Sequence, residues 1–248
     1  KLEDNGSSIG VEVIDLGVEG DTITGFAKLE VGVDTDDSGS DTFDSKLAYV
    51  GLDSNMGALS VGRQSHPFAD NIGGKTSIFN VYGGSSDWNY GSRSSNSMKY
   101  STTQSGLTLD TIGIVDGSST NTNAFDEFEV TISTKLLGSD ISVGYADDVN
   151  SDISYWGVAG STDLGALTVS SSYTIYDAAT DKYGLEATAS YSIFSVGYGD
   201  KEGTGVAYTA GVSHDLNESV SVYAEGEMKD LDSGSDTTSW SIGSKFTF

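Results

Sequence analysis

The 248-residue chain contains no cysteine, one proline and two histidines. The absence of cysteine excludes disulfides, thiolate metal sites and cysteine nucleophiles, and His66 and His214 alone do not suit a histidine-rich metal site. Basic residues number 12 against 37 acidic residues, so the formal net charge is −25. This balance lacks the basic face that nucleic acids require. No run of 18 apolar residues exists, which excludes a membrane-spanning helix.

Glycine is abundant, with 32 residues, and β-branched and aromatic residues are plentiful. Together with the near absence of proline, this composition suits long, regular strands. Apolar and polar residues alternate along the whole chain, the pattern of strands with one apolar and one polar face, and no amphipathic helix is predicted. Fifteen strands are predicted, over residues 8–14, 21–33, 45–53, 57–64, 95–102, 106–116, 125–135, 140–147, 153–161, 165–177, 182–191, 193–199, 204–213, 219–229 and 237–248.

The connections between these strands alternate in length. Short ones such as 54–57 and 136–139 take turns with long ones such as 34–44, 65–94 and 230–236. Short turns on one rim and long loops on the other are typical of an outer-membrane barrel.

The polar faces of the strands carry charges that a dry core would hold only at a cost of several kcal/mol per unpaired ion. A water-filled lumen removes that cost, with the apolar faces turned outward to lipid. We therefore predict an all-β fold, one integral outer-membrane β-barrel domain over residues 1–248; a soluble β-solenoid is the alternative. The predicted lumen-lining residues are Lys28, Glu30, Glu127, Glu129, Glu225 and Glu227.

The number of predicted strands carries a further expectation. Bacterial single-chain barrels have an even number of strands, and the last strand, ending at Phe248, should finish on the side of the short turns. Working backward, the strand over 8–14 starts on the side of the long loops. We therefore expect sixteen strands, with the first one preceding Lys1.

Three segments resemble the general diffusion porins of Gram-negative bacteria. They are the hairpin over 46–52 and 57–64, the long loop over 65–94 and the terminal strand ending at Phe248. The resemblance implies a homotrimer of sixteen-stranded barrels, with the long loop folded into each barrel and narrowing it. It also implies that the terminal strand, with Phe248, is the signal read by the barrel assembly machinery.

The resemblance directs attention to charges at the narrowest point of the pore. We assign Lys46 and Arg63 to a basic wall and Asp70 and Asp87 to an opposing acidic side, with Lys75 and Arg93 as further candidates. Opposed charges across a narrow gap create a transverse field that selects among solutes. In the alternative, Lys46 and Arg63 hydrogen-bond to loop carbonyls, and the two aspartates are ordinary solvated residues.

These features predict passive diffusion of small hydrophilic solutes and ions, with a weak preference for cations because lumen and outer loops are acidic. A substrate-selective channel of the same fold is the alternative, suggested by Tyr82, Trp88 and Tyr90 in the long loop. An acidic adhesin without a pore is another. No enzyme is expected, because neither histidine has a nucleophile placed to pair with it.

No cofactor is required by such a channel. A cluster of acids in an outer loop, formed by Asp34, Asp36 and Asp37, presents oxygen ligands suited to Ca²⁺ or Mg²⁺. An ion there would bridge the loop to lipopolysaccharide, and an ordinary solvated loop is the alternative.

Overall fold

The computed structural model describes residues 3–17, 22–36, 41–84, 86–88, 91–115, 125–149 and 151–247. Its strands form one antiparallel sheet of fifteen strands, arranged in chain order so that each strand pairs with its sequence neighbours. The strands are β1 (Ser8–Leu16), β2 (Ile23–Val33), β3 (Phe43–Ser54), β4 (Gly57–Ser65), β5 (Arg93–Gln104), β6 (Leu107–Ile114), β7 (Glu127–Leu136), β8 (Ser139–Asp148), β9 (Ile153–Leu164), β10 (Leu167–Asp177), β11 (Lys182–Tyr191), β12 (Phe194–Lys201), β13 (Gly205–Asn217), β14 (Val220–Leu231) and β15 (Thr237–Phe246).

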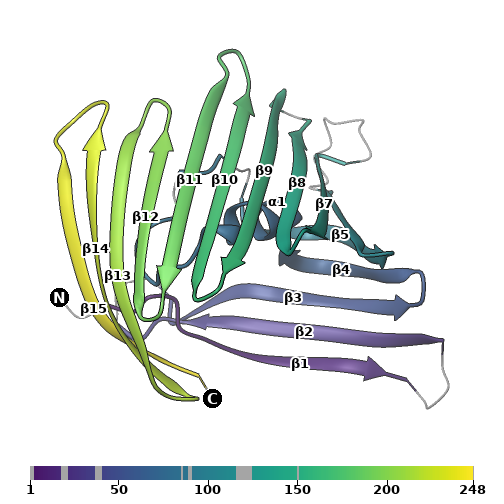
Figure 1. The fold of residues 1–248 in the computed structure, drawn as a ribbon. Coiled ribbons are helices and arrows are strands. Elements are labelled where there is room, and N and C mark those ends of the chain that lie inside the picture. The colour runs from purple at the N-terminus through teal and green to yellow at the C-terminus, as the bar shows by residue number, and fades with distance from the viewer. Residues whose placement is uncertain are drawn as a thin grey trace.

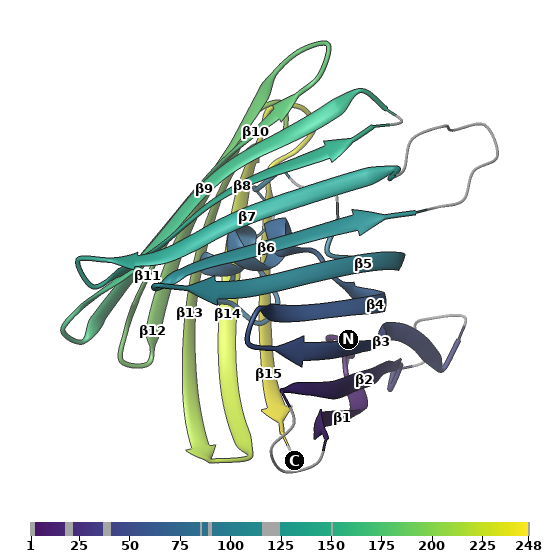
Figure 2. The ribbon, with the colours of Figure 1, turned by 90° about the vertical axis from the view of Figure 1, so that its right-hand side faces the viewer.

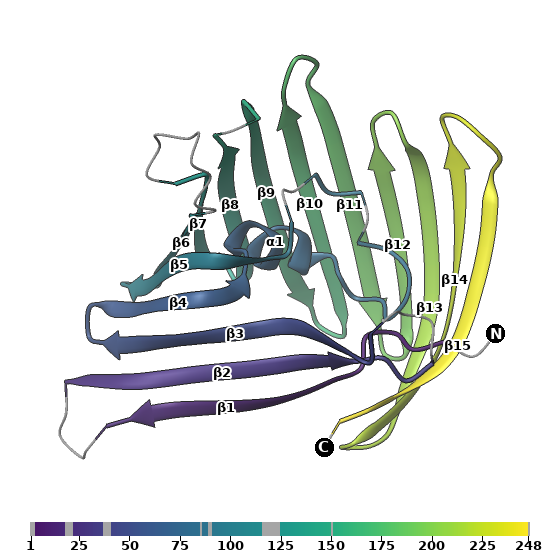
Figure 3. The same cartoon turned by 180° about the vertical axis from the view of Figure 1, so that it is seen from behind.

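The sheet curls around a central segment of the chain. Figures 1 and 3 show β1–β4 running across one side of the curve and β8–β14 standing along the other, with α1 (Pro67–Asn71) between them. Seen from the side in Figure 2, the strands are strongly tilted and β15 ends near β1. The described residues of β1 pair only with β2, and those of β15 only with β14.

The sheet exposes its apolar face and buries its polar face. This is the opposite of a soluble protein, whose apolar side chains are mostly buried. Along β4, Leu59 and Val61 are each 45% exposed, whereas Ser60 and Gln64 are buried. Along β7, β10, β11 and β14 the inner face likewise buries hydroxyl and carboxyl groups. The polar side chains therefore face the inside of the curve, and the predicted outward orientation of the apolar faces is confirmed.

The fifteen predicted strands are all present, with ends that shift by up to four residues. The expectation of a chain without helices is wrong for the long loop, which contains α1 and the 3₁₀ turn η1 (Gly73–Lys75). Proline at the first helical position fixes the backbone angle that begins α1. A five-residue helix is too short to show a repeating apolar stripe, and it is held by the residues it buries.

Among the described residues, the helices are too short and too polar to cross a membrane.

Candidate functional site

The long loop leaves β4 at Ser65, crosses the inner face of the sheet and returns to β5 at Arg93. Its first part is fixed by apolar packing against β8 and β9. Phe68 and Ile72 are almost completely buried, in a cluster with Ala146, Tyr155 and Ala159. This small apolar cluster anchors α1 to a wall whose other buried side chains are mostly polar.

Glycines on the inner face make room for the loop. A side chain at Gly144 or Gly157 would meet Phe68 or Ile72 at 3.3 Å or less. Further along, Gly184 and Gly199 face Ser86 closely, and Gly197 faces Phe79. Each of these positions lies where a loop atom occupies the space that a Cβ would need. Part of the high glycine content therefore comes from the contact between loop and wall.

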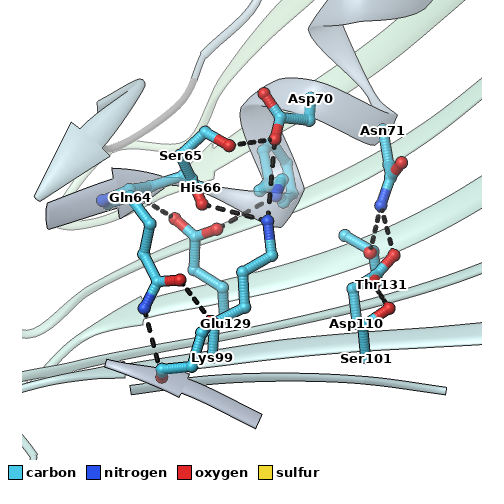
Figure 4. Close-up of polar contacts among 12 residues, drawn as sticks. Gln64, Ser65, His66, Asp70, Asn71, Lys99, Ser101, Asp110, Glu129 and Thr131 are labelled. Atoms are coloured by element: carbon cyan, nitrogen blue, oxygen red, sulfur yellow. Dashed lines mark hydrogen bonds and ion pairs between the residues drawn. The ribbon is translucent and has the colours of Figure 1, made fainter. Parts of the chain in front are cut away.

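The base of the loop is fixed by His66, whose side chain is completely buried. Its Nδ1 lies 2.7 Å from Glu129 Oε1 (Figure 4). Its Nε2 lies 2.9 Å from Ser94 Oγ. The backbone N–H of Phe68 donates to the other carboxylate oxygen, Glu129 Oε2, at 3.0 Å. The expectation that neither histidine has a nucleophile placed to pair with it is therefore wrong for His66, whose Nε2 pairs with the Ser94 hydroxyl.

This trio has the connectivity of a Ser–His–acid triad, but each member is engaged in fixing the loop. Ser94 lies at the start of β5, Glu129 on β7 and His66 just before α1, so the three join the two ends of the loop to the wall. Beside it, Asn71 Nδ2 donates to Thr131 Oγ1 at 2.7 Å and to Asp110 Oδ2 at 3.0 Å.

The middle of the loop is fixed by a second buried carboxylate, that of Glu186 on β11. Thr76 Oγ1 donates to Glu186 Oε2 at 2.8 Å, and the Ser86 backbone N–H donates to Oε1 at 2.8 Å. Glu186 is 3% exposed. One carboxylate therefore joins the outgoing and returning parts of the loop.

The far part of the loop reaches β14. Glu225 Oε1 accepts the backbone N–H of Asn80 at 2.7 Å and its Nδ2 at 2.8 Å, and Glu225 Oε2 accepts the Val81 N–H at 2.9 Å. Glu227 accepts the Gly83 N–H at 3.3 Å and pairs with Lys229 at 2.9 Å. Backbone amides of the loop thus donate to carboxylate oxygens on β7, β11 and β14.

These contacts define where the residues predicted to line the lumen lie. Glu129, Glu225 and Glu227 are on the inner face, where the alternation puts them, but the loop covers their carboxylates and buries them. Glu127 is buried as well. Lys28 lies 3.6 Å from Glu12, a neighbour on β1, and Glu30 is half-buried.

The two residues assigned to a basic wall bind polar atoms outside the long loop. Lys46 Nζ donates to the Gly6 carbonyl at 2.6 Å. Arg63 Nε donates to the Ser45 carbonyl at 3.0 Å, and its guanidinium also reaches Ser95 Oγ at 3.3 Å. The carbonyl partners that the structure gives these two cations, Gly6 and Ser45, both lie outside the long loop. Of the further candidates, Lys75 is half-buried and Arg93 is exposed.

The two loop aspartates have different environments. Asp70 accepts a hydrogen bond from Ser65 Oγ at 2.6 Å and lies 3.7 Å from Lys99 Nζ, with its side chain 48% exposed (Figure 4). Asp87 is only 5% exposed. The structure thus places Asp70 beside β4 and β5. It buries Asp87 in the returning part of the loop, so Asp87 is not an ordinary solvated residue.

Asp87 carries an incompletely satisfied carboxylate. Its Oδ1 accepts a hydrogen bond from Ser172 Oγ at 2.8 Å, whereas its Oδ2 has no hydrogen-bond partner among the described residues. Burial, and secondarily the negative charge of Glu186, raise the pKa of Asp87 to about 6.

The structure is a curved antiparallel sheet with a long loop folded against its polar inner face. Comparison of the sequence with known protein families identifies this architecture. Residues 3–234 match the family described as Gram-negative porin. The chain belongs to the Gram-negative porin family. It is accordingly an integral protein of the outer membrane.

Solved structures share the fold of this porin at low sequence identity. OmpF of Salmonella typhi, solved with daunomycin, gives a TM-score of 0.77 at 16% identity, covering 99% of this chain and 91% of that one. The trimer form of OmpT from Vibrio cholerae gives 0.74 at 17%, covering 93% and 82%. A mutant of the Rh. blastica porin gives 0.67 at 20%, covering 97% and 89%. No curated protein matches the chain.

One group of residues in the porin was not found from the sequence. The ring of Trp88, at the returning end of the loop, has Lys201 Nζ at 4.3 Å and Lys182 Nζ at 5.5 Å from its centroid. The sequence singles out Trp88 only as one sign of a substrate-selective channel. The other two signs are Tyr82, which is half-buried, and Tyr90, which lies outside the described residues. The two lysines carry no sequence signal of their own.

Two other predictions concern the ends of the molecule and its outer loops. Phe248 and Asp37 lie outside the described residues. Asp34 Oδ1 accepts the Asp36 N–H at 3.0 Å, and Asp36 Oδ2 accepts the Asp4 N–H at 2.7 Å. The part of the chain that the structure describes contains no group of three or more acidic or histidine side chains able to hold a metal ion.

Proposed function

We propose that this porin mediates passive diffusion of small hydrophilic solutes and ions across the outer membrane, with a preference for cations, and that it acts as a homotrimer. The observation that carries the proposal is the long loop held against the inner wall. A loop fixed in this way reduces the cross-section of the lumen, so solutes are selected by size and by the charges around them.

The proposed cation preference rests on charges that hydrogen bonding does not neutralise. Glu129, Glu186 and Glu225 bind backbone N–H and side-chain donors of the loop. Neutral donors of this kind satisfy the carboxylate oxygens without placing a positive charge beside them. With a formal net charge of −25 over the chain, the wall and loops attract cations and repel anions.

The homotrimer is proposed from two considerations. OmpT of Vibrio cholerae, which shares this fold, has been solved in a trimer form. Large apolar side chains are also exposed along the outer face, for example Val11, Val13 and Leu29 on β1 and β2. Lipid covers such a face in a membrane barrel, and a partner subunit covers part of it in a trimer.

The test is a planar-bilayer recording on refolded protein in a KCl gradient. We expect ohmic channels that insert in three equal conductance steps, with a reversal potential of the sign for cation permeation. A reversal potential of the opposite sign would overturn the cation preference, and insertion in single unrelated steps would overturn the trimer. The absence of any conductance would overturn the channel itself.

A substrate-selective channel of the same fold is the second candidate, and the observation that favours it is the fixed position of Trp88 on the inner wall. Trp88 Nε1 donates to the Tyr183 carbonyl at 3.0 Å, and its backbone N–H donates to Thr174 Oγ1 at 2.8 Å. Liposome-swelling rates across sugars, amino acids and salts separate the two candidates, because a general channel orders solutes by size and charge alone.

A further inference from the structure

A cavity of about 730 Å³ lies where β8, β9 and β10 meet the β8–β9 and β10–β11 connections, at the upper end in Figure 1. Because successive strands run in opposite directions, this is also the end of the longer β2–β3 and β6–β7 connections. Long connections of outer-membrane barrels are extracellular, so the cavity opens at the outer rim. Its volume is in the range of small-molecule sites. This rim cavity is lined by Tyr145, Asp147, Asp152, Ser154, Tyr176 and Asp177, together with small or apolar residues.

The lining of the rim cavity is acidic, and none of its described residues is basic. Asp147 and Asp177 lie opposite Ser154 from its two sides, in the pairings of β8 with β9 and of β9 with β10. Asp152 lies in the β8–β9 connection, and it is exposed, as is Asp177. None of the three carboxylates forms an ion pair with a described residue. Lys182, on the neighbouring strand β11, has its ammonium group 5.5 Å from the Trp88 ring instead.

Two tyrosine rings among the lining are held in place by neighbouring rings. The ring of Tyr145 lies 4.5 Å from that of Trp156, its partner across β8 and β9. The ring of Tyr176 lies 5.6 Å from that of Tyr155 and 5.0 Å from that of Trp88. Aromatic faces attract organic ammonium groups, and walls fixed before binding reduce the entropy lost when a ligand binds. The cavity therefore combines negative charge with preorganised aromatic surface.

The spacing of the carboxylates indicates the kind of cation. Asp147 and Asp177 are on strands separated by one strand, so their backbones are about 10 Å apart. A metal ion requires its oxygen ligands to converge on one point, and the described part of the chain contains no group of three or more side chains able to hold one. Two ammonium groups joined by a carbon chain reach carboxylates at this separation, and the methylene groups between them cover the tyrosine rings.

We propose that the rim cavity binds organic cations that carry two or more ammonium groups joined by a carbon chain. Asp147, Asp152 and Asp177 accept the ammonium groups, and Tyr145 and Tyr176 contact the chain between them. The inference goes beyond diffusion through the lumen, because the site lies on the outer rim and does not depend on conduction. Since Tyr176 also contacts Trp88 of the long loop, the cavity adjoins the inner face, and a cation held there is at the mouth of the pore.

The test is saturation-transfer NMR on refolded protein in detergent, with 1,6-diaminohexane as the probe. We expect saturable binding that weakens as NaCl is added, because salt screens exposed charges. 1,6-Hexanediol has the same carbon chain without charge and should not bind. Hexylamine has one ammonium group and should bind more weakly than the diamine.

Paired variants locate the binding. Asp152→Asn/Asp177→Asn should bind the diamine about tenfold more weakly, the effect of losing two exposed charge pairs. Asparagine tolerates the positive φ of 54° at Asp152. The matched control is Asp41→Asn/Asp232→Asn, which removes the same charge at exposed positions of other connections at the same end and should bind like the wild type.

A ring variant tests the aromatic wall. Tyr145→Leu should weaken binding about two- to fivefold, the effect of an exposed cation–π contact. Tyr208→Leu removes another exposed tyrosine outside the cavity and should have no effect. Conductance in a planar bilayer shows that each variant has folded.

Equal binding of the diamine by the two double variants, or equal binding of the diol and the diamine by the wild type, would overturn the site. Channels that conduct but bind no diamine would overturn this inference and leave the proposed function intact. A wild-type protein that binds the diamine at this site without conducting would overturn the proposed function alone.

Discussion

Replacing Glu225 by glutamine should release the far part of the long loop. The carboxylate accepts two hydrogen bonds from Asn80 at Oε1 and one from Val81 at Oε2. Glu225 is 6% exposed. Glutamine has the same shape but offers one acceptor oxygen and one NH₂ donor. Whichever way it turns, its NH₂ group faces at least one N–H of the loop, so a buried donor loses its partner.

The magnitude follows from the number of donors affected. Leaving a buried donor unsatisfied costs about 1–3 kcal/mol. Since 1.4 kcal/mol corresponds to about a tenfold change in an equilibrium constant, the population with residues 80–83 detached should rise about 5- to 150-fold. The strands themselves keep their pairing, so the barrel should remain folded.

The assay is the current noise of single channels at fixed voltage. Glu225→Gln should add fluctuations to the open level that the wild type lacks, and it should admit larger sugars in liposome swelling. Glu30→Gln serves as control, because Glu30 is a half-buried carboxylate on β2 with no described contact to the long loop. If both variants had the same noise and the same size limit, the loop would not depend on Glu225, and the reasoning would be refuted.

Three further predictions concern the same loop. Because the pKa of Asp87 is raised to about 6, docking of the loop should weaken as pH rises from about 4 to about 6. The current noise of single channels should therefore increase over this pH range, and Asp87→Asn should abolish the increase. Gly184→Val should displace the returning loop and raise conductance, whereas Gly160→Ala, which meets only Asp140 at an ordinary 3.5 Å, should not. Phe68→Ala should cost about 3–5 kcal/mol of packing and make the loop sensitive to added protease in intact liposomes.

The strands could be predicted from sequence because each one repeats its own signal every second residue. Glu127, Glu129 and Thr131 alternate with Phe128 and Ile132, and the structure buries the first set and exposes the second. This signal is local, so a strand can be predicted from it without knowing which strands are its neighbours. The helix α1 has no comparable signal, since Phe68 makes it stable only through contact with β8 and β9.

The candidate site could be predicted in part. Alternation puts Glu225 on the inner face, but its partner Asn80 is 145 residues away in sequence. The path of the loop across the wall decides that pairing, and no local pattern encodes the path. The same holds for His66 and Ser94, and for the lysines beside Trp88.

The loop also explains how acidic side chains are tolerated on the inner wall. A buried carboxylate is unfavourable unless donors satisfy it, and the loop supplies donors from its own backbone at Glu129, Glu186, Glu225 and Glu227. The requirement is mutual, because the backbone amides of an irregular segment also need acceptors when they are buried. Lysines in those positions would leave the amides unsatisfied, since an ammonium group accepts no hydrogen bond. Docking the loop through its N–H groups therefore requires hydrogen-bond acceptors on the wall, and four of the acceptors used here are carboxylates. The way the loop is held thus favours an acidic wall over a basic one.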